Sequence, residues 1–176
     1  MRFVDLLKTT VLICAASATV LGAVAVLSAA SAEENGPLFF AAGWWLLAGA
    51  VGAYLGRRAE TTPPIARLLA GARTATSLPE QRPGSMLLNR LWPLFLVTVA
   101  ASALAVVAPQ IPAIAAGFAV IWALSWRRQE SAVSAIEERD GVQFYVERTS
   151  PLKPIQLVRA PGFRRIGPTP ATPPTR

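Results

Sequence analysis

Residues 91–126, LWPLFLVTVAASALAVVAPQIPAIAAGFAVIWALSW, decide the fold, because no charged residue interrupts them. One continuous helix of these 36 residues would be about 54 Å long, nearly twice the roughly 30 Å of a bilayer's hydrocarbon core. The stretch therefore predicts two membrane spans. Pro109 and Pro112 divide them, because proline lacks an N–H donor and disfavours helix in the preceding residue. We expect spans at about 88–108 and 112–126, joined as a tight helical hairpin.

Two more charge-free stretches, 9–32 and 35–56, precede this segment. They predict spans at about 9–31 and 37–56. The whole chain has 53% hydrophobic and only 15% charged residues, which is too apolar for a soluble domain. The predicted fold class is an all-α membrane protein with four transmembrane helices, which form a domain over residues 1–126.

The basic residues predict the orientation of these spans. All seventeen Lys and Arg residues lie before the first span, between the second and third, or after the fourth. Cytoplasmic segments carry the excess of Lys and Arg, so both termini are expected in the cytoplasm (N-in, C-in). The expected location is the plasma or inner membrane of the cell, as a multi-pass protein. The many arginines and alanines suggest GC-rich coding and a bacterial source.

A cleaved signal peptide is the alternative interpretation of residues 1–32. Ala30-Ser31-Ala32 has the small-x-small form that signal peptidase accepts. The apolar run is, however, much longer than the roughly 7 to 15 residues of a signal-peptide core, which favours a retained span.

The cytoplasmic loop 57–87 contains one amphipathic segment. Pro63 and Pro64 suit a first helical turn, and apolar residues then recur on one face. We expect an interfacial helix at about 63–74 that lies on the inner leaflet. A loosely ordered loop is the alternative.

Residues 127–160 predict a small cytoplasmic extension. The fourth helix should continue unbroken to about Arg139, since no Gly or Pro intervenes, and should stop at Gly141. Alternating apolar residues at 142–158 then suggest a short β-hairpin, although a lone hairpin is marginal in water. The proline-rich tail, 161–176, is expected to be disordered.

No motif in the sequence indicates chemistry. The chain has no histidine, one cysteine (Cys14) and no phosphate-binding or nucleophile motif. Three acidic residues, Glu137, Glu138 and Asp140, are close in sequence, but we interpret them as exposed residues of the helical extension. We therefore expect no catalytic, cofactor-binding or metal-binding residues, no cofactor and no enzymatic activity. The net charge of +7 is explained by anionic lipid rather than nucleic acid, and no nucleic-acid partner is expected.

One helix face and a set of arginines are the candidate interaction sites. In the second span, small residues at i, i+3, i+4 and i+7 form a smooth face for helix packing: Gly49, Gly52, Ala53 and Gly56. Its expected partner is the first helix, through Ala15, Ala18, Thr19 and Gly22, or another protein. The residues expected to contact lipid head groups are Arg57, Arg58, Arg67, Arg73, Arg90, Arg127 and Arg128.

The tryptophan pair Trp44-Trp45 lies within the second span. We interpret it as a packing feature rather than a ligand-stacking site. The favoured function is a non-catalytic accessory or scaffold component that packs against other membrane proteins. Alternatives are a transporter subunit or a pore-forming, holin-like oligomer. The expected partners are membrane lipids and either another membrane protein or further copies of the chain.

Overall fold

The computed structural model describes residues 1–31, 36–57, 61–74, 83–147 and 155–161. The chain is mostly helical. In order, its elements are α1 (Phe3–Ser31), α2 (Gly36–Leu55), α3 (Pro63–Ala70), β1 (Arg73–Thr74), α4 (Pro83–Ala103), a 3-10 turn η1 (Leu104–Val106), α5 (Gln110–Trp126), α6 (Gln129–Asp140), β2 (Val142–Val146) and β3 (Leu157–Pro161).

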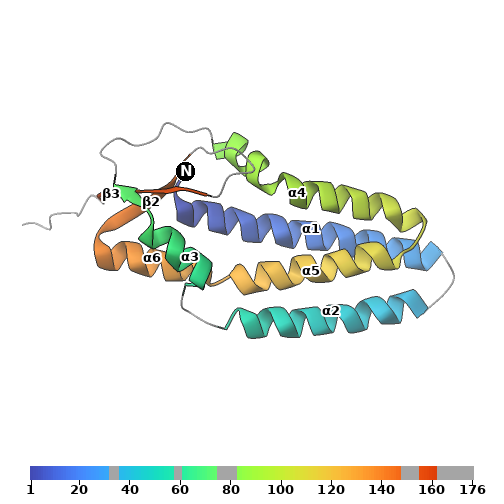
Figure 1. Cartoon of the computed structure of the whole chain (residues 1–176). Helices are drawn as coiled ribbons and strands as arrows, with labels where there is room; N and C mark the ends of the chain where they lie inside the picture. Colours follow the sequence, from blue (N-terminus) through green and yellow to red (C-terminus); the bar gives the residue numbers. More distant parts are fainter. Residues whose placement is uncertain (32–35, 58–60, 75–82, 148–154, 162–176) are drawn as a thin grey trace, which may run out of the picture.

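Four helices, α1, α2, α4 and α5, run along one long axis (Figure 1). Helix α5 lies between α1 and α2 and provides the main packing surface for both, whereas α4 packs less extensively on α1 and α5. Within the described residues, three stretches are long and apolar enough to cross a membrane: Phe3–Ser31, Gly36–Leu55 and Gly84–Val106. Helix α5 is equally apolar in character but has 17 residues, or about 26 Å of helix.

The other elements form a compact unit at one end of the bundle, which we call the cap (Figure 1). It consists of residues 1–8, α3, α6 and the three strands. Its buried core is contributed by segments far apart in the sequence, and includes Phe3, Leu7, Ile65, Val133, Phe144, Val146 and Leu157. Burial of these large apolar side chains away from water stabilises the cap.

The strands form a three-stranded sheet in the order β1-β3-β2. Strand β2 pairs antiparallel with β3, with Tyr145 opposite Val158. Strand β2 lies within residues 142–158, where a hairpin was predicted, whereas most of β3 lies beyond Val158. Strand β1 adds to β3 in parallel, a pairing that was not predicted from the sequence. At the opposite edge of the sheet, on β2, the N–H of Val146 donates to the carbonyl of Met1 at 3.1 Å. Strand β3 also includes Pro161, which was assigned to the tail; residues 162–176 lie outside the described residues.

The prediction of an unbroken fourth helix is wrong. Helix α5 ends at Trp126, Arg128 has φ −95° and ψ −7°, and α6 begins at Gln129. Two contacts explain the break: Arg128 Nη1 donates to the Arg57 carbonyl at 3.0 Å, and the N–H of Thr62 donates to Gln129 Oε1 at 3.1 Å. The chain bends here so that α6 packs beside the start of α1.

The predicted stop of this helix is confirmed. Gly141 has a left-handed φ of 63°, and its N–H donates to the Glu137 carbonyl. A residue with a side chain is disfavoured in this conformation, whereas glycine adopts it readily.

The interfacial helix is also shorter than expected and faces protein. Helix α3 ends at Ala70, and residues 73–74 form β1 instead of continuing the helix. Ile65 is only 2% exposed and packs in the cap core, with Leu68 and Leu69 against it. The apolar face of α3 is therefore covered by the cap, not presented to lipid as predicted.

Candidate functional site

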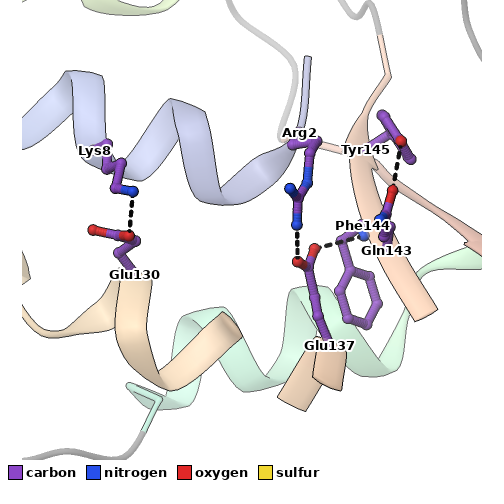
Figure 2. Close-up of polar contacts among 7 residues, drawn as sticks. All are labelled: Arg2, Lys8, Glu130, Glu137, Gln143, Phe144 and Tyr145. Atoms are coloured by element: carbon purple, nitrogen blue, oxygen red, sulfur yellow. Dashed lines mark hydrogen bonds and ion pairs between the residues drawn. The ribbon is translucent and has the colours of Figure 1, made fainter. Parts of the chain in front are cut away.

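Glu137 on α6 forms a buried polar contact between distant parts of the described chain. Its Oε2 accepts a hydrogen bond from Arg2 Nη2 at 2.7 Å, and its Oε1 accepts one from the N–H of Phe144 at 2.9 Å (Figure 2). The Glu137 side chain is only 5% exposed. The interpretation of Glu137 as an exposed residue is therefore wrong, because the bend before α6 turns it toward the chain's N-terminus and β2.

The contact with Glu137 also affects the pKa of Arg2. The hydrogen bond to Glu137 raises the pKa of the Arg2 guanidinium, against the opposing effect of burial. Arg2 therefore stays cationic and forms an ion pair with Glu137. Nε of Arg2 is buried with no hydrogen-bond acceptor among the described residues. Because each of its two carboxylate oxygens accepts one of these hydrogen bonds, Glu137 joins the start of the chain, α6 and β2.

A second ion pair links the same two helices. Lys8 Nζ on α1 lies 2.8 Å from Glu130 Oε1 on α6 (Figure 2). The remaining two acidic residues of the cluster are at the surface: Glu138 is exposed, and Asp140 pairs with its neighbour Arg139 at 2.9 Å. Hydrogen bonding from Arg139 lowers the pKa of Asp140. Glu137 and Asp140 thus have separate partners, and the described residues of this cluster form no shared metal site.

Helix α2 is attached to α5 by its tryptophan pair. Trp44 Nε1 donates to the Ile114 carbonyl at 3.2 Å, and Trp45 Nε1 donates to the Ala113 carbonyl at 2.9 Å. The Trp44 indole lies over Gly117, where an added Cβ would fall 2.0 Å from Nε1. The pair therefore has the packing role that the sequence favoured, and Gly117 leaves the space that it needs.

Only half of the small-residue face predicted on α2 contacts another helix. A Cβ on Gly52 would lie 2.9 Å from Leu124 Cβ, and one on Gly56 would lie 2.2 Å from the Leu124 carbonyl oxygen. A Cβ on Gly49 would meet nothing within 4 Å, and Ala53 is exposed. Gly49 and Ala53 therefore do not belong to this packing surface.

The partner of this face is α5, not the first helix as expected. Sequence reasoning missed Gly117, although a signal for it existed. Small residues in the fourth span recur at helical spacing, at Ala113, Ala116, Gly117 and Ala123, and all four are buried. This stripe on the central helix is what α1 and α2 pack against.

A groove remains where α1 and α2 diverge over α5, and we call it the α1–α2 groove. Its volume is about 390 Å³. The small residues of α1 that were expected to pack on α2 line one wall, and Trp45 contributes from α2. The full small-residue set on α1 is Ala15, Ala18, Thr19 and Gly22, and α5 adds Ala116, Val120, Ala123 and Leu124.

A larger groove lies on the opposite side of α1, between α4 and the α1–α5 pair; we call it the α4 groove. Its volume is about 790 Å³. Its lining is apolar except for Thr10, Thr98 and Arg90. The hydroxyls of Thr10 and Thr98 donate to carbonyls four residues earlier in their own helices, so Arg90 is the charged group that lines this groove.

The arginines expected at lipid head groups are mostly at the surface. Arg90 is half-buried, and Arg58 lies outside the described residues. Their contact with lipid stays a prediction. Those that are exposed are Arg57, Arg67, Arg73, Arg127 and Arg128.

The residues that the structure describes contain no cluster of three or more His, Cys, Asp or Glu side chains that could hold a metal ion. These residues do contain two apolar grooves, and two ion pairs that link α6 to the start of the chain, which suit binding and packing.

Comparisons with protein families, with curated proteins and with solved structures each found no match for the chain.

Proposed function

We propose that the chain is a multi-pass protein of the cell membrane in which α1, α2, α4 and α5 are four transmembrane helices. Helix α5 is the shortest of them, but it lies between two candidate spans and presents Phe118 and Trp122 at the surface. Both ends of the described chain meet in the cap, where Met1 bonds to Val146. Together with the confinement of all Lys and Arg residues to one side, this supports an orientation with both termini in the cytoplasm.

With this topology, we assign the protein a non-catalytic accessory or scaffold role. It holds a transmembrane helix of another membrane protein in the α1–α2 groove and presents the cap to the cytoplasm. The observation that carries this role is the composition of the groove, whose α1 wall is built from Ala15, Ala18, Thr19 and Gly22.

Small side chains matter here because lipid tails are as apolar as leucine. Helices in a bilayer associate through close van der Waals packing of their backbones, which small residues permit. Ala15 and Thr19 are exposed, and Trp45 occupies the far side of the groove. The groove therefore offers an incoming helix a close approach to α1 without displacing α2 from α5.

The cap connects such a binding event to the cytoplasm. Helix α1 runs from the groove directly into the cap core, where Phe3 and Leu7 are each 2% exposed. The Arg2–Glu137 and Lys8–Glu130 pairs join this end of α1 to α6. A helix held against α1 would thus be placed at a defined position relative to the cap surface.

Site-specific photo-crosslinking in intact cells tests this role. A photo-crosslinking phenylalanine derivative is placed at Ala18 or Thr19 in the groove, and at Leu46, which is 77% exposed on α2 outside the groove, as the matched control. We expect an adduct with a distinct membrane protein from the groove positions alone. An adduct between two copies of this chain would instead indicate the pore-forming oligomer, and adducts no stronger than at Leu46 would reject the accessory role.

A groove-filling variant provides the second arm. Ala18→Leu should abolish the adduct formed through Thr19 while leaving the melting temperature of the purified protein unchanged. A large loss of thermal stability would show that Ala18 serves internal packing instead, and would contradict the proposal.

Orientation is tested separately by cysteine labelling in a Cys14→Ala background. Val107 is 81% exposed between η1 and α5, and Glu138 is exposed on α6. Val107→Cys should react with a membrane-impermeant maleimide in intact cells, and Glu138→Cys should react only after permeabilisation. Equal reaction at both positions in intact cells would overturn the topology.

A further inference from the structure

Helix α4 is the least buried part of the bundle. In its most apolar window only 6% of residues are buried, compared with 22% in α1. The helix contacts α1 and α5 over a small area, and the α4 groove of about 790 Å³ separates them over much of their length. A bilayer leaves no such volume empty, so the groove has an occupant in the membrane.

The length of the groove matches a lipid chain. Its lining runs along α4 from Arg90 and reaches Leu104 at the start of η1, a distance of about 21 Å at the rise of an α-helix. One leaflet contributes roughly half of the approximately 30 Å hydrocarbon core. An acyl chain that enters at one end can therefore lie within the groove over its full depth in the leaflet.

The side chains of the groove distinguish it from the α1–α2 groove. Large apolar groups line it, including Leu94 and Val97 on α4 and Ile114, Phe118 and Trp122 on α5. Such side chains keep a second helix backbone at a distance, whereas helix pairs in membranes favour small residues. A flexible acyl chain can follow an irregular wall of this kind.

The charge of the groove lies at one end. Arg90 is half-buried in the first half of α4, and Thr10 faces the same end from α1. In the four-span topology this is the cytoplasmic end, where anionic lipids are concentrated. A guanidinium group binds phosphate oxygens in a fixed, bidentate geometry, and the apolar groove continues from that position toward the bilayer centre.

We infer that the α4 groove binds an anionic phospholipid, with its phosphate at Arg90 and an acyl chain between α4 and the α1–α5 pair. The inference rests on the proposed topology but not on the accessory role. It makes the lipid a structural part of the protein, since it fills the space between α4 and the other spans.

The test is native mass spectrometry of the full chain in mild detergent, titrated with phosphatidylglycerol or phosphatidylcholine. Arg90→Gln should weaken phosphatidylglycerol binding about fivefold, the effect of about 1 kcal/mol per basic residue near an anionic lipid, and should leave phosphatidylcholine binding nearly unchanged. Arg127→Gln is the matched control, because Arg127 is exposed and does not line the groove.

Occupancy of the groove itself is tested by a neighbouring pair on α4. Ala100 lines the groove, whereas Val99 is 69% exposed and lies outside it. Ala100→Phe should weaken binding of both lipids about tenfold, a loss of about 1.4 kcal/mol, and Val99→Phe should not.

Two results would overturn the inference: equal effects of Ala100→Phe and Val99→Phe, or equal effects of Arg90→Gln on the two lipids. If the labelling of Val107→Cys and Glu138→Cys shows the opposite orientation while Ala100→Phe still blocks lipid, the topology fails and the groove site remains. If the crosslinking at Ala18 and Thr19 fails, only the accessory role is lost.

Discussion

Arg2 Nη2 lies 2.7 Å from Glu137 Oε2, so the second residue of the chain is bonded to a helix 135 positions later. Glu137 also accepts the N–H of Phe144, which joins α6 to β2. The start of the chain therefore meets α6 and the neighbouring strand β2 at one carboxylate.

Replacing Glu137 by Ala should destabilise the cap by about 1–3 kcal/mol, because the buried Phe144 N–H loses its acceptor and Arg2 loses its partner. Arg2 is 42% exposed, so water compensates for part of the lost ion pair. Hydrogen exchange at the Phe144 amide should accelerate accordingly. Glu138→Ala, at an exposed neighbouring position, is the control, and equal exchange in the two variants would contradict the role of Glu137.

The Lys8–Glu130 pair should respond to salt more than the Arg2–Glu137 pair does. Its two side chains are 56% and 26% exposed, and exposed ion pairs are screened by salt. A double-mutant cycle with Lys8→Met and Glu130→Gln should give a coupling that shrinks between 0.05 M and 1 M NaCl. A coupling that is unchanged across this range would show that the pair is shielded from solvent.

Gly117→Ala should destabilise the packing of α2 on α5. The added Cβ would collide with the Trp44 indole, and such overpacking typically costs about 1–3 kcal/mol. The melting temperature of the purified protein measures the effect. Trp44→Leu removes the colliding ring, so the Gly117→Ala/Trp44→Leu double variant should lose less stability than the sum of the single variants. Strict additivity would show that the two residues are not in contact.

Gly56→Ala and Gly49→Ala form a matched pair on one helix. At Gly56 the added Cβ would meet the backbone carbonyl of Leu124 at 2.2 Å, which no side-chain rotation can relieve. We expect a loss of about 1–3 kcal/mol there and a change within about 0.5 kcal/mol at Gly49, where a Cβ meets open space. Thermal unfolding that ranks the two variants equally would mean that α2 packs through a different face.

The sequence by itself determined the apolar helices and some of their ends, although α4 ends at Ala103 rather than near 108 and the fourth helix breaks after Trp126. Charge-free runs have a length that can be compared directly with a bilayer, and the conformational limits of proline and glycine are local. The limit set by proline placed a division of residues 91–126 at Pro109, and the freedom of glycine placed the end of the last helix at Gly141. The face of α2 was found in part, because small residues at helical spacing allow close approach whatever the partner is.

Only the tertiary structure decided which surfaces meet. The sequence of α2 does not show which helix it packs against. The contacts of Trp44, Trp45 and Gly117 in the structure identify α5, rather than α1, as its partner. At the helix break Arg128 bonds to the Arg57 carbonyl, and the buried Glu137 carboxylate bonds to Arg2. These interactions join residues that are 71 and 135 positions apart, and no local pattern of propensity or charge can specify contacts over such distances.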